Sequence, residues 1–224
     1  MTFARGIGLL RMSIVRAHIS VSADGYVAGP NQSLENPLGE GGEALHEWVV
    51  ALRAWREAHG LEGGEVNAST AVVDESLAAV GAEIMGRGKF GGGPGPWEES
   101  WRGWWGDEPP FRMPVFVLTH HGREPLRLSG TTFTFMTEGI ESALDQARTA
   151  AAGKDVLIGG GADVINQYLA AGLVDELEVH IAPLVLGGGA RLYEGVGPDV
   201  RLEQVRAVEA PGVTHVKYRV LGVG

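Results

Sequence analysis

Strand-like and helix-like segments alternate along most of this 224-residue chain, and two consecutive strands end it. A helix between two strands returns the chain to the same end of the sheet, so strands joined in this way pair in parallel. The last two strands are separated only by "APG", which is typical of a hairpin. The sequence therefore predicts a largely parallel sheet covered by helices on both faces, with antiparallel strands at one edge. The predicted strands are residues 13–22, 82–86, 115–119, 131–136, 155–159, 175–186, 201–209 and 213–221.

Four segments are predicted to be helices: residues 43–58, 69–80, 139–151 and 162–171. Apolar residues in the first of these recur at the spacing of one face of an amphipathic helix. They are Leu45, Trp48, Val49, Leu52 and Trp55. Asn67 or Ser69 is the candidate N-cap of the second helix, because the side chains of both residue types accept hydrogen bonds from free N–H groups.

The overall charge and composition exclude several classes of protein. The formal net charge is −10, and the sequence has no block of Lys and Arg that could follow a nucleic-acid backbone. Cysteine is absent, which excludes disulfides and thiolate sites and suits a cytoplasmic protein. No apolar run approaches the roughly 18 residues of a membrane span. We interpret residues 1–11 as a disordered leader and residues 12–224 as a single domain.

Residues 157–165, "LIGGGADVI", place three glycines between a strand and a helix. Free N–H groups at a helix N-terminus attract anions, and glycine lets the backbone approach a phosphate closely. Many strand-to-helix turns, however, need glycine only for its backbone freedom. From the residues alone, the segment from Gly159 to Asp163 is either a phosphate cradle or a tight turn.

A second glycine-rich segment, "IMGRGKFGG", follows the strand at 82–86. It matches G-x-G-x-x-G, but "GGGPGP" comes next and cannot form the helix that a dinucleotide-binding fingerprint requires. Arg87 and Lys89 remain as a basic pair in an otherwise acidic chain. They indicate either recognition of a phosphate or a solvated basic turn.

Asp24 lies in "SADGYVAG", directly after the first strand, at the edge of a parallel sheet where ligands bind. Its carboxylate could orient or protonate a substrate, although Asp-Gly is also a common turn pair. Four tryptophans between residues 97 and 105 could wall a flat ligand or cover an apolar patch. The sequence shows no metal-ligand constellation and no G-x-S-x-G nucleophile motif.

Four segments in order resemble the reductase family related to dihydrofolate reductase, in particular the C-terminal reductase domain of the riboflavin-pathway deaminase–reductase. They are "SADGYVAG", "IMGRGKF", "VLTH" and "LIGGGADVINQYLAAGLVDELEVHIAPLVLGGGARLYEG". The resemblance covers about residues 13–222. It implies a three-layer α/β/α sandwich on a mixed, mostly parallel eight-stranded sheet, with NADPH as the cofactor and a homodimer as the assembly.

The same resemblance implies roles for individual residues. Arg87 and its neighbours Gly86, Gly88 and Lys89 would hold the adenosine 2′-phosphate of NADPH. Gly159, Gly160, Gly161, Ala162 and Asp163 would hold the pyrophosphate, and Thr119 with His120 would line the adenosine side. Val27 and Ala28 would contact the nicotinamide, and Asp24 would lie near the substrate. The candidate substrate-binding residues are Ser22, His46, Trp48 and Trp97.

The chain departs from dihydrofolate reductase in two places. Lys89 occupies the position of a threonine, and the segment 29–58 is longer, with no equivalent of the substrate-binding carboxylate. The resemblance still implies an NADPH-dependent reductase that transfers a hydride to a carbonyl or imine carbon of a small pteridine-, pyrimidine- or sugar-like molecule. A non-catalytic nucleotide-binding or regulatory dimer of the same fold is the alternative, and a cofactor-free hydrolase-like protein is a third.

Overall fold

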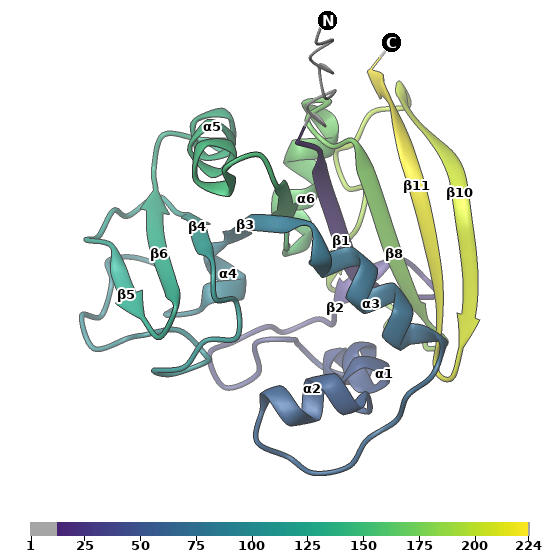
Figure 1. Cartoon of the computed structure of the whole chain (residues 1–224). Coiled ribbons are helices and arrows are strands. Elements are labelled where there is room, and N and C mark those ends of the chain that lie inside the picture. Colours follow the sequence, from purple (N-terminus) through teal and green to yellow (C-terminus); the bar gives the residue numbers. More distant parts are fainter. Residues whose placement is uncertain (1–12, 224) are drawn as a thin grey trace, which may run out of the picture.

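A nine-stranded sheet forms the centre of the computed structural model, which describes residues 13–223 (Figure 1). The strand order is β10-β11-β8-β1-β7-β3-β4-β6-β5. The inner strands from β8 to β6 run parallel, whereas β10, β11 and β5 are antiparallel to their neighbours. The strands are β1 (Val15–Ser22), β3 (Val80–Gly86), β4 (Pro114–Leu118), β5 (Leu126–Leu128), β6 (Thr131–Met136), β7 (Asp155–Ile158), β8 (Glu176–Ala182), β10 (Val200–Ala210) and β11 (Val213–Val223).

The α/β class and the mostly parallel mixed sheet are confirmed, with two differences from the prediction. The ninth strand is β5, whose three residues are too short to show a clear alternating pattern. Its pairing with β6 also makes the second edge of the sheet antiparallel, where the sequence predicted antiparallel strands at one edge only. The predicted leader at residues 1–11 lies outside the described residues.

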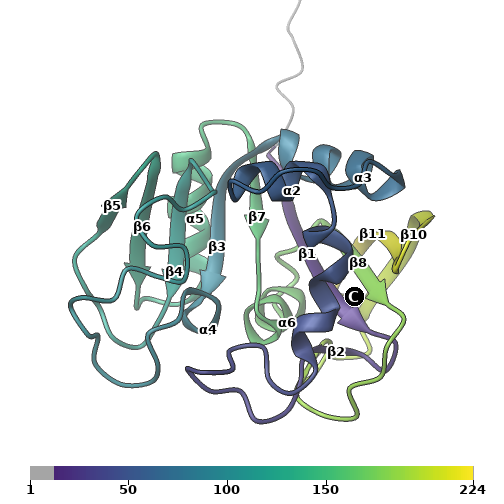
Figure 2. The same ribbon diagram turned by 90° about the horizontal axis from the view of Figure 1, so that it is seen from below.

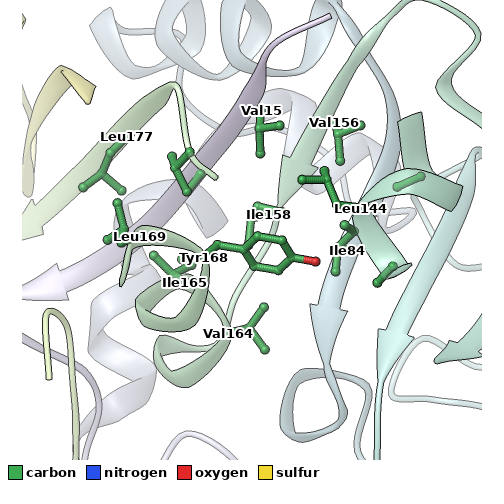
Figure 3. Packing of buried hydrophobic residues seen from close by; sticks show 14 of the residues in the cluster. Val15, Ile84, Leu144, Val156, Ile158, Val164, Ile165, Tyr168, Leu169 and Leu177 are labelled. Carbon is green, nitrogen blue, oxygen red and sulfur yellow. The ribbon is translucent and has the colours of Figure 1, made fainter. Parts of the chain in front are cut away.

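Helices cover both faces of the sheet. Helices α5 (Ile140–Ala151) and α6 (Ala162–Ala170) pack on one face, where apolar side chains from β1, β3, β7 and β8 form the main core (Figure 3). Tyr168 is completely buried there, and its hydroxyl donates to the carbonyl of Ile140 at 2.7 Å. Helix α3 (Ala68–Ala78) covers the opposite face, in front of β1 and β8 in Figure 1.

The opposite face carries a second apolar cluster and an extensive set of polar groups. The apolar cluster surrounds Phe90, Phe133 and Phe135 and includes partly buried tryptophans of the 97–105 loop. The polar set lies under α3, where Glu75 from that helix pairs with Arg206 and with Lys217 at 3.2 Å. This face therefore combines an apolar cluster with a group of ion pairs under α3.

The single helix predicted over 43–58 is wrong, because three short pieces replace it. They are the 3-10 helix η1 (Gly42–His46), α1 (Glu47–Val50) and α2 (Arg53–Ala58). Leu52 adopts an extended conformation and forms a bridge with Glu65, whose N–H donates to Ala51 O at 2.8 Å. The bridge replaces helical hydrogen bonds at this point, although Leu52 still buries its side chain as the apolar pattern predicts.

The strand predicted over 175–186 ends four residues early, at Ala182. Pro183 follows and has no N–H to donate to a neighbouring strand. The chain then turns over the end of β1, where Ala23 N donates to Leu184 O at 2.8 Å. Two further strands that the sequence did not indicate, β2 (Tyr26–Ala28) and β9 (Ala190–Arg191), pair as a small separate sheet beside this turn. Among the described residues, no helix has both the length and the apolar character needed to cross a membrane.

Candidate functional site

The candidate site residues that follow β4, β3, β7 and β1 lie along one edge of the sheet. These strands are neighbours and run parallel, so their carboxyl ends are adjacent. Thr119 follows β4, Arg87 follows β3, Gly159 follows β7, and Asp24 follows β1. In Figure 2 the arrowheads of β3, β7 and β1 point to the lower side of the view, where α4 (Arg87–Phe90), α6 and β2 lie. The edge of a parallel sheet is the usual ligand-binding position in α/β proteins.

The glycine turn after β7 is tied to β3 by backbone hydrogen bonds on both sides. Gly159 N donates to Ile84 O at 2.9 Å, and Gly86 N donates to Gly160 O at 2.8 Å. Gly160 has a φ of +94°, and the Gly160–Gly161 peptide is cis. An added Cβ at Gly161 would meet no atom within 4 Å. Packing therefore does not explain the third glycine, whose open side leaves room for a ligand.

Helix α6 begins at this turn, and no side chain caps it. Gly161 is the N-cap residue, so the first N–H groups of the helix have no helical carbonyl to bond. Such groups favour an anion. Ala162 is buried, whereas Asp163 is exposed and its carboxylate accepts a hydrogen bond from Gln167 at 2.8 Å. The turn fits a phosphate group through its backbone, with the side chain of Asp163 directed along the helix.

The two basic residues after β3 point to different partners. The Arg87 guanidinium donates to Gly95 O at 2.6 Å and lies 3.7 Å from the ring centre of Trp97. The Lys89 ammonium donates to Glu83 Oε1 at 2.8 Å and to Gly159 O at 2.9 Å. Both residues belong to the one-turn helix α4, where the sequence indicated a turn. Gly88 between them is exposed, and a Cβ at Gly86 would lie 2.8 Å from Val164.

An open cleft of about 430 Å³ lies beside Trp97, next to the end of β4. His120 and Arg123 are among its lining residues. The Thr119 hydroxyl accepts from His121 N at 3.1 Å, which fixes the turn that carries His120. Burial lowers the pKa of Arg87 from its usual value. The structure thus brings together Arg87, Thr119, His120 and Trp97 on the β4 side of the edge.

Asp24 anchors a loop at the opposite end of the edge. Its carboxylate accepts hydrogen bonds from Ser22 Oγ at 2.6 Å, Gly187 N at 2.7 Å and Leu186 N at 3.1 Å. The Ser22 hydrogen bond and these backbone N–H groups lower the pKa of Asp24 to about 2. The carboxylate is therefore ionised at neutral pH, a state that accepts hydrogen bonds and does not supply a proton.

Val27 and Ala28, predicted to contact a nicotinamide, belong to β2 and are buried. A Cβ at Gly189 would lie 2.1 Å from Ala28 O, so the loop after β8 packs closely against this strand. The structure places both residues beside Asp24, at the β1 end of the edge.

Four histidines and Trp48 form a polar cluster under η1 and α1, defined by His18, His46, His180 and His215. His180 Nδ1 and His215 Nδ1 are 2.8 Å apart, so one ring donates to the other and at least one ring is neutral. The Trp48 ring lies 4.9 Å from both of these rings, and its N–H donates to Ser20 Oγ at 3.1 Å. Two of the predicted substrate-binding residues, His46 and Trp48, therefore belong to this histidine cluster. A third, Trp97, lies elsewhere, beside Arg87.

The pKa values of these histidines are low, chiefly because of burial. Burial first, and the charge of Lys89 second, lower the pKa of His18 to about 4. The same two causes lower the pKa of His46. His18 Nδ1 is buried and has no hydrogen-bond partner among the described residues. Within residues 13–223, no group of three or more His, Cys, Asp or Glu side chains is placed to hold a metal ion.

Sequence reasoning did not single out Glu83, His18, His180, His215 or Arg123. One signal was available for Glu83, which is a charged residue inside the otherwise apolar strand "AEIMG". A buried carboxylate requires a partner, so this position pointed to a nearby cation. The histidines gave no such signal, because they come from three separate strands, β1, β8 and β11, and meet only through sheet pairing.

The fold and the site edge define the class of the protein as an α/β protein of the dihydrofolate reductase-like type. A putative riboflavin biosynthesis protein from a Shewanella species superposes with a TM-score of 0.63 at 18% identity, covering 92% of this chain and 98% of that chain. Dihydrofolate reductase from Enterococcus faecalis, complexed with NADP(H), gives a TM-score of 0.52 at 14% identity, covering 93% and 96%.

The chain belongs to the RibD C-terminal domain family, whose model matches residues 13–216. It is also 37% identical over 67 residues to the uncharacterized protein YyaP of Bacillus subtilis. That match covers 30% of this chain and 36% of YyaP, so it spans about a third of the relative's length. The predicted family and fold are therefore confirmed.

Proposed function

We propose that this protein is an NADPH-dependent reductase that acts on a small polar molecule. The observation that carries the proposal is the order of the candidate segments along the sheet edge. The β4, β3, β7 and β1 ends bring, in that order, Thr119 with His120, then Arg87, then Gly159–Gly161, and then Asp24 with β2. This order is the linear order of adenosine, 2′-phosphate, pyrophosphate and nicotinamide in NADPH.

The residues on this edge suit such a cofactor. The Arg87 guanidinium and the His120 ring offer hydrogen-bond donors for the 2′-phosphate. The Trp97 ring offers an aromatic surface for the adenosine. The open side of Gly161 and the uncapped start of α6 suit the pyrophosphate. Membership of the RibD C-terminal domain family and the fold shared with an NADP(H) complex add support.

When bound, NADPH would supply the hydride, and the chain would bind, orient and exclude water. We propose a carbonyl or imine carbon of a pteridine-, pyrimidine- or sugar-like molecule as the acceptor. This substrate would bind beside the polar cluster under η1 and α1, with His46, Trp48 and Ser22 among the residues that contact it. Asp24 would hold the 183–187 loop and β1 in position beside the nicotinamide, because its carboxylate is already engaged by N–H and O–H donors.

Tryptophan fluorescence provides the first test. NADPH and NADH are titrated into the full chain, and quenching of the fluorescence of its six tryptophans reports binding. We expect NADPH to bind more tightly than NADH, and Arg87→Ala to remove most of that difference. Absence of quenching by either nucleotide would overturn the proposal. Equal affinity for both would remove Arg87 from recognition of the 2′-phosphate.

A screen of small carbonyl and imine compounds, followed by the loss of NADPH absorbance, separates a reductase from a nucleotide-binding protein that does not react. We expect at least one pteridine, pyrimidine or sugar compound to be reduced. Binding of NADPH without turnover across the screen would favour the non-catalytic alternative.

We also propose that the protein acts as a homodimer on a small-molecule substrate. The exposed Val185, Val205 and Leu221 are apolar residues that a subunit contact could cover. Light scattering coupled to size-exclusion chromatography measures the assembly. We expect twice the mass of the 23.7 kDa chain, and a monomer mass would contradict the proposal.

A further inference from the structure

The ion pair of the buried Glu83 and the partly exposed Lys89 lies against the glycine turn. Glu83 is 4% exposed on β3, and its Oε1 is 2.8 Å from Lys89 Nζ. A Cβ on Gly159 would lie 2.1 Å from Glu83 Oε1 and 2.7 Å from Lys89 Nζ. The first glycine of the turn is therefore required by this pair, whereas the third glycine has open space beside it.

The pair also holds the turn in place. Lys89 Nζ donates to Gly159 O at 2.9 Å, in addition to its contact with Glu83. These two contacts use two of the three N–H donors of an ammonium group. Because β3 also bonds Gly159 N and Gly160 O through its backbone, the carbonyl oxygens of both glycines are engaged. The N–H groups at the start of α6 are thereby fixed in direction.

Lys89 and Arg87 are directed to opposite neighbours of β3. Arg87 contacts the 92–97 loop and Trp97, and Trp97 in turn packs 5.0 Å from Phe135 of β6. Lys89 contacts the residue that follows β7. Since β4 and β7 flank β3 on different sides, the two cations serve different parts of the edge.

We propose that Lys89, held by Glu83, is the positioning residue of the glycine turn, and that it favours an anionic pyrophosphate there without taking part in recognition of the adenosine 2′-phosphate. The inference rests on the proposed function, because it assumes that NADPH is the ligand. It divides the basic pair of the "GRGK" segment into two roles: Arg87 acts on the β4 side, and Lys89 acts on the β7 side.

Buried charge explains why two residues are needed. A lysine placed beside the turn without a carboxylate would lose hydration with little compensation, and a buried Glu83 without a cation would cost more. Glu83 holds the Lys89 ammonium at a fixed point, and its carboxylate compensates the positive charge of that ammonium. The Lys89 side chain is still 31% exposed, so a ligand that approaches the turn from solvent can contact the cation.

The test compares two ligands on four variants of the full chain. NADPH carries both phosphate sites, whereas adenosine 2′-monophosphate carries the 2′-phosphate and no pyrophosphate. Dissociation constants are measured by tryptophan quenching, with competition against NADPH for the weaker ligand. The variants are Lys89→Met, Lys89→Arg, Arg87→Ala and the double variant Glu83→Gln with Lys89→Met, which leaves no unpaired charge at the site.

We expect Lys89→Met to raise the dissociation constant of NADPH about tenfold, the factor that one charge-assisted hydrogen bond supplies. The dissociation constant of adenosine 2′-monophosphate should stay within about twofold of its wild-type value. Lys89→Arg, which keeps the cation, should restore most of the NADPH affinity. Arg87→Ala should weaken both ligands by about the same factor. The double variant should melt as one cooperative transition and show the same selective loss of NADPH as Lys89→Met.

Three results would overturn the inference. An equal loss of both ligands in Lys89→Met would place Lys89 at the 2′-phosphate. A folded double variant with wild-type affinity for NADPH would show that the cation has no role. If the wild-type chain binds neither ligand, the proposed function fails together with the inference, whereas wild-type binding with unchanged variants defeats the inference alone.

Discussion

At the scale of single residues, Asp24 shows how hydrogen bonds decide what a carboxylate can do. Its pKa is lowered to about 2 by Ser22 Oγ and by the N–H groups of Gly187 and Leu186. A lowered folded-state pKa means that the stabilisation is present above the unfolded value of about 3.8 and is lost as the pH falls through 2. We therefore expect Asp24→Asn to lower the melting temperature at pH 7, and we expect this effect to shrink as the pH falls below 3.8.

The same variant tests chemistry. Asn keeps one acceptor oxygen but loses the charge, so the 183–187 loop should loosen while the site remains formed. If Asp24 only anchors, the variant should raise KM more than it lowers kcat. A fall in kcat of about a hundredfold or more, with unchanged stability, would instead mark Asp24 as an acid–base group.

The first and third glycines of the turn provide a matched comparison at the same scale. Gly159→Ala would place a methyl group 2.1 Å from Glu83 Oε1, which forces the ion pair apart. We expect it to destabilise the protein by about 1–3 kcal/mol, the cost of overpacking, in thermal or urea unfolding. Gly161→Ala meets open space at a φ of −66°, so its stability should stay within about 0.5 kcal/mol of wild type.

The ligand distinguishes the two variants further. If a phosphate approaches the turn, the Gly161→Ala methyl group would occupy part of its space and weaken NADPH without loss of stability. An unaffected NADPH affinity in that variant would mean that the third glycine is not part of the ligand site. The comparison separates a glycine required for folding from one kept for function.

Residue types and motif order allowed the sequence to indicate most of the edge, but not the direction of each side chain. Arg87 and Lys89 are two positions apart in a segment that the sequence indicated as a glycine-rich turn, so no helical periodicity was available to assign them to different sides. Their directions depend on Trp97 and on Glu83, which reach the site through loop packing and sheet register. The histidine contacts likewise depend on the β8–β11 register, in which His180 pairs with His215.

At the scale of elements, helix α3 depends on a local signal that the sequence shows clearly. Asn67 is its N-cap: the side-chain oxygen accepts from Ser69 N at 2.9 Å, and the Thr70 hydroxyl accepts from Asn67 N at 3.3 Å. This reciprocal arrangement satisfies two N–H groups that would otherwise be free. We expect Asn67→Ala to lower the free energy of unfolding by about 1 kcal/mol.

Asn67→Asp is the matched control, because a carboxylate accepts the same hydrogen bond and also suits the positive end of the helix. It should unfold at or above the wild-type midpoint in urea. An unchanged free energy of unfolding in Asn67→Ala would contradict the prediction and show that α3 does not depend on its cap.

Helices and strands that their own residues define were predicted to within a few positions. Examples are α3, α5 and α6, whose ends are marked by caps and glycines. The errors fall where a distant segment changes the backbone. Leu52 leaves the helical conformation because Glu65 bonds across it, and β2 exists because β9 returns to pair with it. Such pairings are tertiary, and local patterns do not contain them.

At the scale of the whole molecule, the buried histidines make folding sensitive to acid. Burial, followed by the charge of Arg206, lowers the pKa of His215 to about 4. Burial also lowers the pKa of His180 well below its usual value. His18 also has a pKa of about 4. In the unfolded chain these groups titrate near 6.5, so the unfolded state binds more protons between pH 6.5 and 4. Stability is therefore fully present above 6.5 and decreases as the pH falls toward 4.

Urea unfolding as a function of pH measures this dependence. Between pH 7 and pH 5, His18 and His215 should each lower the free energy of unfolding by up to about 2 kcal/mol. The reason is that each histidine takes up nearly one proton when the chain unfolds in this range. In His215→Gln, which keeps a side chain able to contact His180 and Ser69, the slope of stability against pH should fall by up to about 1.4 kcal/mol per pH unit. His121→Gln, on the exposed loop after β4, is the control and should keep the wild-type slope. If His215→Gln retains the wild-type slope, the acid sensitivity belongs to groups other than His215, although His215 contacts His180 across the β8–β11 pairing.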